Sequence, residues 1–168
     1  MKKFFPFILL VWPYLFFPAA YLKYADTETG IPWLLIFCIL TPVVYIANII
    51  CAIRTNDTKF LARWNMVLKL CHIPVFLFIF IYGVAVALAV WAFLFFTPII
   101  LAILVIIDVL LLCTTSTYGI CALVRTRLEN RISMKFMAVN IIMHLLFVWD
   151  VISSIIVFFK LRKAKPAE

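Results

Sequence analysis

Long apolar runs constrain this chain more than any other feature of its sequence. Runs of about 18 or more apolar residues are typical of transmembrane helices, and most of the 168 residues belong to such runs. Charged residues make up only 13%, against roughly a quarter in soluble domains, so a soluble fold could not cover its core with polar surface. We therefore predict an all-α integral membrane helical bundle. Residues 1–168 form one transmembrane domain with five spans, at 4–22, 31–53, 70–95, 99–124 and 136–159.

Turn-forming and capping residues separate the predicted spans. Pro32 and Pro98 suit the first turns of the second and fourth spans, and Ser133 is a suitable N-cap for the fifth. The first span is the least regular, because three prolines interrupt it. It also resembles a signal peptide, since Lys2 and Lys3 precede an apolar run, and its cleavage would leave four spans.

The net charge of +8 follows the pattern of an inner-leaflet membrane surface. With a cytoplasmic N-terminus, ten of the 15 Lys and Arg residues lie inside, and Lys23 and the four cations of the tail lie outside. We therefore expect a multi-pass protein of the bacterial plasma membrane whose inner basic loops attract anionic lipid. The basic tail opposes this topology, because five spans place it outside. No compact basic face is present to track phosphates, so nucleic-acid binding is not expected.

The connection between the second and third spans, Asp57 to Lys69, has helical periodicity. Phe60, Leu61 and Trp64 share one face, which fits a short helix lying in the membrane interface with Asp57 as its cap. An irregular basic loop is the alternative. In either case we count Lys69 with the inner loops.

Ionisable side chains inside apolar spans are costly and often functional. The candidates are Asp108 in the fourth span, and His144 and Asp150 in the fifth. Helical spacing places Thr41 and Tyr45 of the second span on one face. Counted from the outer ends of the spans, the two aspartates and Thr41 fall in one layer, and Tyr45 and His144 in a deeper one. Three interpretations stay open: hydrogen bonds that hold helices together, an ion, proton or small-ligand site, and catalysis.

Small residues in the third span predict a packing face. Gly83 and Ala87 lie one helical turn apart, a spacing that lets helix backbones approach closely. The contact would lie within the bundle or between subunits.

The five cysteines include no C-x-x-C pair, so we expect small apolar side chains and no cofactor. A metal site at the inner ends of spans two to four is the alternative, because thiolates and an imidazole fall at one depth there. Its ligands would be Cys51, Cys71, His72 and Cys121.

Three short runs carry a family resemblance. Lys69–Pro74 and Asp150–Ser153, with Tyr118–Gly119 between them, resemble small bacterial multi-pass membrane proteins with no assigned function. The resemblance implies neither an activity nor site residues. No nucleophile–base arrangement is visible at any spacing, which does not favour an enzyme. We predict an accessory, immunity or assembly subunit that acts through a membrane-protein partner or a second copy of itself. The alternative is a transporter or ion-pathway protein built around the three intramembrane ionisable residues.

Overall fold

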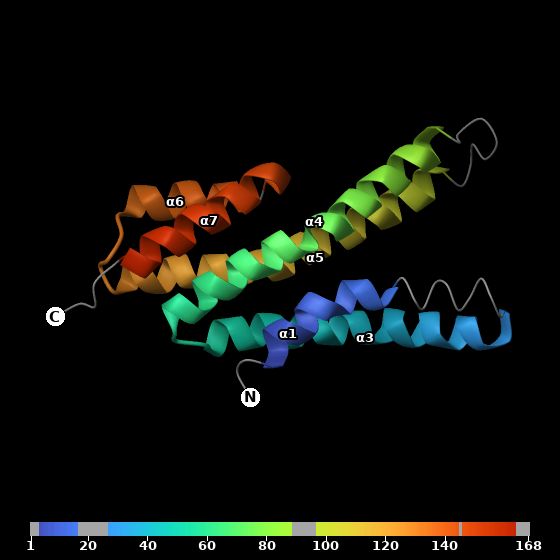
Figure 1. Ribbon diagram of the computed structural model, residues 1–168, viewed down its shortest axis with the longest axis horizontal. Helices are drawn as coiled ribbons and strands as arrows, with labels where there is room; N and C mark the ends of the chain where they lie inside the picture. The colour runs from blue at the N-terminus through green and yellow to red at the C-terminus, as the bar shows by residue number, and fades with distance from the viewer. Residues whose placement is uncertain (1–3, 17–26, 89–96, 145, 164–168) are drawn as a thin grey trace.

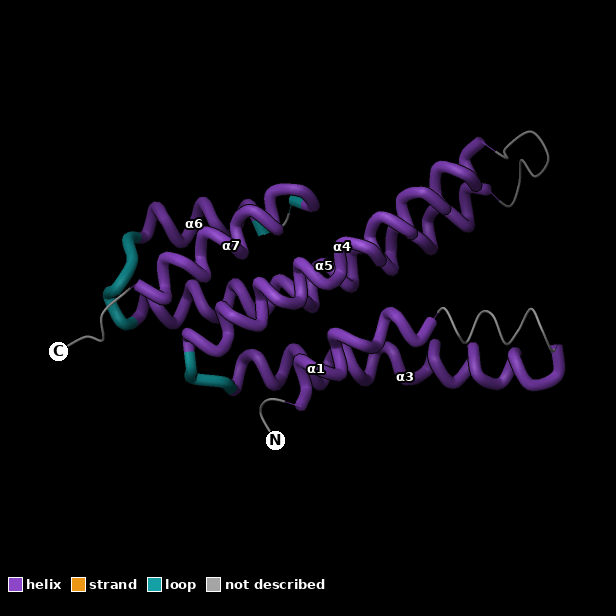
Figure 2. Tube along the Cα trace, viewed as in Figure 1, coloured by secondary structure: helices purple, strands orange, loops and turns teal. Residues whose placement is uncertain are grey.

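The structure is a computed structural model that describes residues 4–16, 27–88, 97–144 and 146–163. This part of the chain is helical apart from short turns and contains no strand, which confirms the all-α prediction (Figure 2). In chain order the elements are α1 (Phe4–Val11), the 3-10 helix η1 (Trp12–Leu15), α3 (Thr27–Arg54), α4 (Thr58–Leu88), α5 (Thr97–Leu128), α6 (Met134–Met143) and α7 (Phe147–Lys163).

Three long helices form the body of the molecule. The chain runs along its length in α3, returns in α4 and runs back in α5 (Figure 1). These three are the described helices that are long and apolar enough to cross a membrane. The 31 residues of α4 rise about 46 Å at 1.5 Å per residue, against about 30 Å of hydrocarbon.

The predicted fifth span is two helices. α6 ends at Met143, α7 begins at Phe147, and the two pack side by side as a hairpin that returns the chain toward the end where α6 began (Figure 1). With 10 and 17 residues, they rise about 15 and 25 Å, which is short of the hydrocarbon thickness. The count of five spans is therefore not confirmed.

The N-terminal segment is short and packs against α3 and α4. Its helix gives way to η1 at Trp12, because Pro13 has no N–H to donate to the carbonyl of Leu9. His72 of α4 lies beside that carbonyl, with its Nε2 3.2 Å from Leu9 O and its Nδ1 2.7 Å from Leu68 O, and a neutral ring donates to one of the two. Residues 17–26, which include the end of the predicted first span, lie outside the described residues.

α4 begins earlier than the predicted third span. Asp57 caps it, as predicted, and its Oδ1 accepts a 3.0 Å hydrogen bond from Phe60 N. The helix then continues without a break past Lys69, despite Pro74 in its interior. Lys69 is therefore not a loop residue. It lies eleven residues inside the helix and is fully buried.

Backbone hydrogen bonds cap the C-terminus of α5. Asn130 has a φ of 57°, and the amides of Asn130 and Arg131 donate to the carbonyls of Arg127 and Thr126. This is a Schellman motif with Asn in place of the usual glycine. The turn leads directly to Ser133, whose side chain accepts from Phe136 N and caps α6, as predicted.

Candidate functional site

A buried polar face on α4 organises the interior of the bundle. Asn65, Lys69 and His72 follow the spacing i, i+4, i+7, so they lie on one side of the helix. All three have 0% solvent exposure. α4 packs with this side against α5 and α7, which supply the polar partners of Lys69.

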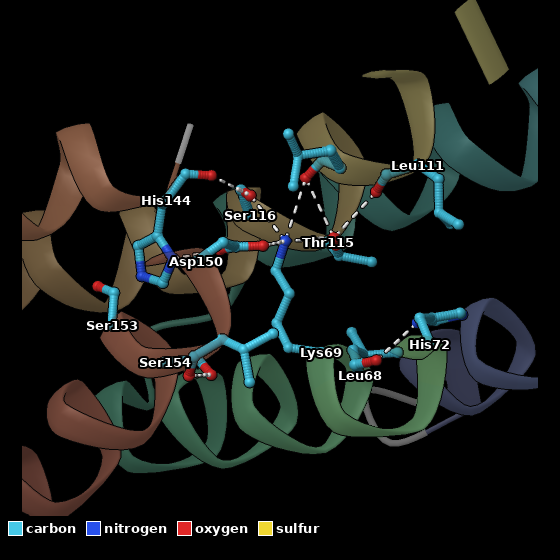
Figure 3. A network of polar contacts seen from close by, with 12 residues as sticks. Leu68, Lys69, His72, Leu111, Thr115, Ser116, His144, Asp150, Ser153 and Ser154 are labelled. Carbon is cyan, nitrogen blue, oxygen red and sulfur yellow. Dashed lines mark hydrogen bonds and ion pairs between the residues drawn. The ribbon is translucent and has the colours of Figure 1, made fainter. Parts of the chain in front are cut away.

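The Lys69 ammonium has an acceptor for each of its N–H groups (Figure 3). Its Nζ forms an ion pair with Asp150 Oδ2, and donates to Thr115 Oγ1 at 2.6 Å and to Ser116 Oγ at 2.8 Å. An ammonium carries three N–H groups, so its hydrogen-bonding capacity is filled. This is the condition under which a buried charge is tolerated.

Asp150 and His144 complete the network at the break between α6 and α7. His144 Nδ1 lies 2.7 Å from Asp150 Oδ1, so both carboxylate oxygens are occupied. His144 is the C-cap of α6, and its carbonyl accepts a 2.9 Å bond from Ser116 Oγ. Asp150 lies in the first turn of α7, where the helix dipole favours a carboxylate. We call Lys69, Asp150 and His144 the charge network.

The second ring nitrogen of His144, Nε2, has no hydrogen-bond partner among the described residues. Because Nδ1 donates to the carboxylate, Nε2 of a neutral imidazole carries the lone pair. Among the described residues, neither Nε2 nor either polar atom of the Asn65 amide has a hydrogen-bond partner, and all of these atoms are buried. They meet at Gly119: a Cβ there would lie 2.5 Å from His144 Nε2 and 2.8 Å from Asn65 Nδ2. A side chain at residue 119 would therefore collide with this corner.

Further hydrogen bonds join the remaining helices. Tyr118 donates its hydroxyl to Asn48 Oδ1 at 2.8 Å, which connects α5 to α3. Ser153 of α7 lies 2.8 Å from Asn140 Oδ1 of α6 and holds the hairpin together. Trp12 Nε1 donates to Thr41 Oγ1 at 2.9 Å and connects η1 to α3.

The predicted polar layers are only partly brought together. His144 and Asp150 are in contact. Thr41 instead accepts a hydrogen bond from Trp12 of the N-terminal segment, and Tyr45 is buried in the core. Asp108 is not among the partners of the other two ionisable residues, and its buried Oδ1 has no partner among the described residues. The predicted cluster of Asp108 with Asp150 is therefore replaced by a cluster of Asp150 with Lys69.

The predicted packing residues behave differently from each other. A Cβ added to Gly83 would lie 3.9 Å from side-chain atoms of Leu101 and Leu104, which is ordinary van der Waals distance. Gly83 thus faces α5 without a close backbone approach, and Ala87 is exposed.

The alternative metal site is not assembled. No group of three or more His, Cys, Asp or Glu placed to hold an ion is present in the described part of the chain. Cys71 is exposed, Cys51 and Cys121 are half-buried, and the His72 ring faces the carbonyls of Leu9 and Leu68.

Sequence reasoning missed Lys69, Asn65 and Gly119. The sequence offered a signal for Asn65 and Lys69. Both precede His72 at helical spacing, and the chain is largely apolar from Trp64 onward, which indicates a polar face on one helix. A carboxylate at residue 150 also requires a cation, and Lys69 is one of the basic residues that directly border a predicted span. No local pattern predicts Gly119, because its role depends on two side chains from other helices.

The chain belongs to a family of unknown function, DUF6652, whose model matches residues 4–163. No curated protein and no solved structure matches it. The match extends over every described helix, so the charge network and the hairpin lie inside the family region.

Proposed function

We propose that this protein is a small integral protein of the bacterial plasma membrane that acts through partners, as an accessory, immunity or assembly subunit. In this role the charge network holds α4, α5 and α7 together in the interior of the protein. One observation carries the proposal: the Lys69–Asp150 pair at the centre of the network is saturated with hydrogen bonds. Lys69 uses all three N–H groups and Asp150 uses both oxygens, with side-chain exposures of 0% and 1%. A conducting or catalytic group needs an open position, and this pair has none.

The surface supports residence in a membrane. Large apolar side chains are exposed along α3, α4 and α5, including Ile39 at 68%, Phe80 at 66% and Val105 at 60%. Soluble monomers rarely expose contiguous apolar patches beyond a few hundred Å². Here the exposed apolar residues extend over Leu35–Ile53 of α3, Leu70–Leu88 of α4 and Ile99–Leu110 of α5, as expected for contact with lipid.

The distribution of charge supports an orientation. The connection α3–α4, the connection α5–α6 and the end of α7 lie at one end of the molecule (Figure 1). That end carries almost every described cation: Arg54, Lys59, Arg63, Arg125, Arg127, Arg131, Lys135, Lys160 and Arg162. By the positive-inside rule it faces the cytoplasm, and the hairpin brings the basic tail to the same side.

Asp108 supports a partner. It lies in the N-terminal half of α5, among neighbours such as Val105 and Ile107 that are exposed. Asp108 is half-buried, so part of this residue reaches the surface, where a donor on a neighbouring helix would offset the cost of a carboxyl at membrane depth. A partner subunit or a second copy of this chain would supply that donor.

The partner role can be tested by site-specific photocrosslinking in native membranes. A crosslinker at Val105 should give a discrete protein adduct, identified by mass spectrometry, that disappears in the Asp108→Leu background. A crosslinker at Ile39, equally exposed on α3, is the matched control. Co-expression of two differently tagged copies separates self-association from a second protein. Lipid adducts alone at both positions would contradict the proposal.

A second function, a proton or ion pathway, is favoured by a single feature. His144 Nε2 and the Asn65 amide are buried, polar and without partners in the described part of the chain, and an imidazole nitrogen is a group that accepts a proton. Purified protein in liposomes with a pH-sensitive dye decides between the two functions. The first proposal expects proton leakage equal to that of empty liposomes. Leakage that a folded Asp150→Asn variant abolishes would establish the second function in its place.

A further inference from the structure

A pocket opens at the basic end of the molecule between the start of α4 and the end of α7. Its volume is about 190 Å³, well above the roughly 10–15 Å³ that one water needs, so a polyatomic group fits. Three residues of each helix line it: Lys59, Ala62, Arg63, Phe158, Leu161 and Arg162. Both triplets follow i, i+3, i+4, so each helix presents one continuous face to the pocket.

The lining consists of an apolar floor, formed by Ala62 and Leu161, and a charged rim, formed by Lys59, Arg63 and Arg162. Ala62 and Leu161 are buried, at 1% and 3% exposure. Lys59, Arg63 and Arg162 are exposed cations. The pocket therefore joins an apolar surface to three positive charges.

No carboxylate of the described residues pairs with these cations. The lining contains no acidic residue, and in the described ranges none of the three cations has an ion pair. Asp57, two residues before Lys59, uses its Oδ1 to cap α4. Three like charges gathered without a counterion repel one another, and an anion bound between them removes that repulsion.

We propose that this basic pocket binds the phosphate headgroup of an anionic glycerophospholipid of the inner leaflet. The inference rests on the membrane residence proposed above, and it narrows the expectation of lipid at the basic loops to one site. Lys59, Arg63 and Arg162 hold the phosphate, and Phe158 and the floor contact the glycerol and the start of the acyl chains. The apolar floor favours a lipid over a free anion, because a soluble phosphate gains nothing from it.

The test uses the full chain in nanodiscs, with native mass spectrometry to count retained lipids. We expect preferential retention of phosphatidylglycerol over phosphatidylcholine. Each basic residue near an anionic lipid contributes about five-fold in affinity, so Lys59→Gln/Arg63→Gln/Arg162→Gln should lose about 100-fold. The rim is exposed, so this variant should keep the parent circular dichroism spectrum.

A charge-matched control separates a site from general attraction. Arg54, Lys135 and Lys160 are exposed cations at the same end, outside the pocket. Their triple change to Gln removes the same charge and should leave the lipid preference intact. An equal loss in both variants, or no loss in the pocket variant, would overturn the proposal.

Two further experiments distinguish a lipid from a soluble anion as the ligand. Phe158→Ala should weaken phosphatidylglycerol retention while leaving any effect of inorganic phosphate unchanged. Displacement of the lipid by millimolar phosphate, with no effect of Phe158→Ala, would make the pocket a soluble-anion site and refute lipid binding. Failure of the protein to enter nanodiscs would refute membrane residence and the lipid site together, whereas insertion without lipid selectivity would refute the lipid site alone.

Discussion

Removing one member of the Lys69–Asp150 pair should be far more damaging than removing both. Lys69→Met keeps the length of the side chain and leaves Asp150 as a buried anion with His144 as its remaining partner. Asp150→Asn keeps an acceptor for His144 and leaves a buried ammonium without a counterion. Both side chains are at most 1% exposed, so each single change should cost about 3–5 kcal/mol of unfolding free energy.

The double variant Lys69→Met/Asp150→Asn contains no buried unpaired charge. The Asn side chain still accepts from His144, and Ser116 still donates to the His144 carbonyl at 2.9 Å. We expect it to be within about 1–2 kcal/mol of the parent, because neutral replacements of buried ion pairs are often tolerated. The resulting coupling free energy is well above the average of about 0.6 kcal/mol for one hydrogen bond between transmembrane helices.

Steric trapping in bicelles gives the four unfolding free energies, with apparent Tm in detergent as a second measurement. Tyr118→Phe is the matched control, because it removes a buried bond to Asn48 without leaving a charge, and should cost only about 0.6–2 kcal/mol. If the double variant loses as much unfolding free energy as the two single variants together, Lys69 and Asp150 are not energetically coupled. If the singles match Tyr118→Phe, the charges do not form a buried ion pair.

Two glycines and two labelling positions provide the remaining predictions. Gly119→Ala should cost about 1–3 kcal/mol, because its Cβ would lie 2.5 Å from His144 Nε2, and an unchanged detergent Tm would contradict the geometry of this corner. Gly83→Ala, with ordinary 3.9 Å contacts, should be neutral or stabilising by up to about 1 kcal/mol in the same assay, and a loss there would reveal a closer contact. In a cysteine-free background, Lys135→Cys should resist an impermeant thiol reagent in intact cells while Ile99→Cys, near the opposite end, reacts. The reverse pattern would invert the proposed orientation.

Much of the fold could be predicted from local sequence. The length of the apolar runs predicts α3, α4 and α5, although α4 begins at Thr58, twelve residues before the predicted third span. The caps formed by Asp57 and Ser133 were also predictable, since a capping side chain bonds to a backbone amide two or three residues away. These features are local, which is why the sequence specifies them.

The ion pair could not be predicted by the rule that was applied to Lys69. Counting basic residues assigns a lysine next to an apolar run to the loop, where most such lysines lie. The structure places it inside the bundle because Asp150, Thr115 and Ser116 together fill its hydrogen-bonding capacity. Those partners are between 46 and 81 residues away in the sequence, so their convergence depends on how three helices pack.

The hairpin gives the polar residues of the last apolar run a structural reason. A chain that turns within the membrane exposes backbone groups, and such a turn is tolerated only where protein covers it and supplies bonds. His144 lies at the turn, Ser116 donates to its carbonyl, and Asp150 begins the return helix while holding the His144 ring. In the proposed membrane-resident fold, these polar side chains hold the turn between α6 and α7 together, a role that a straight span would not need. The same reversal brings Lys160 and Arg162 to the end where the other described cations lie, so these two no longer oppose the proposed orientation as they would after five straight spans.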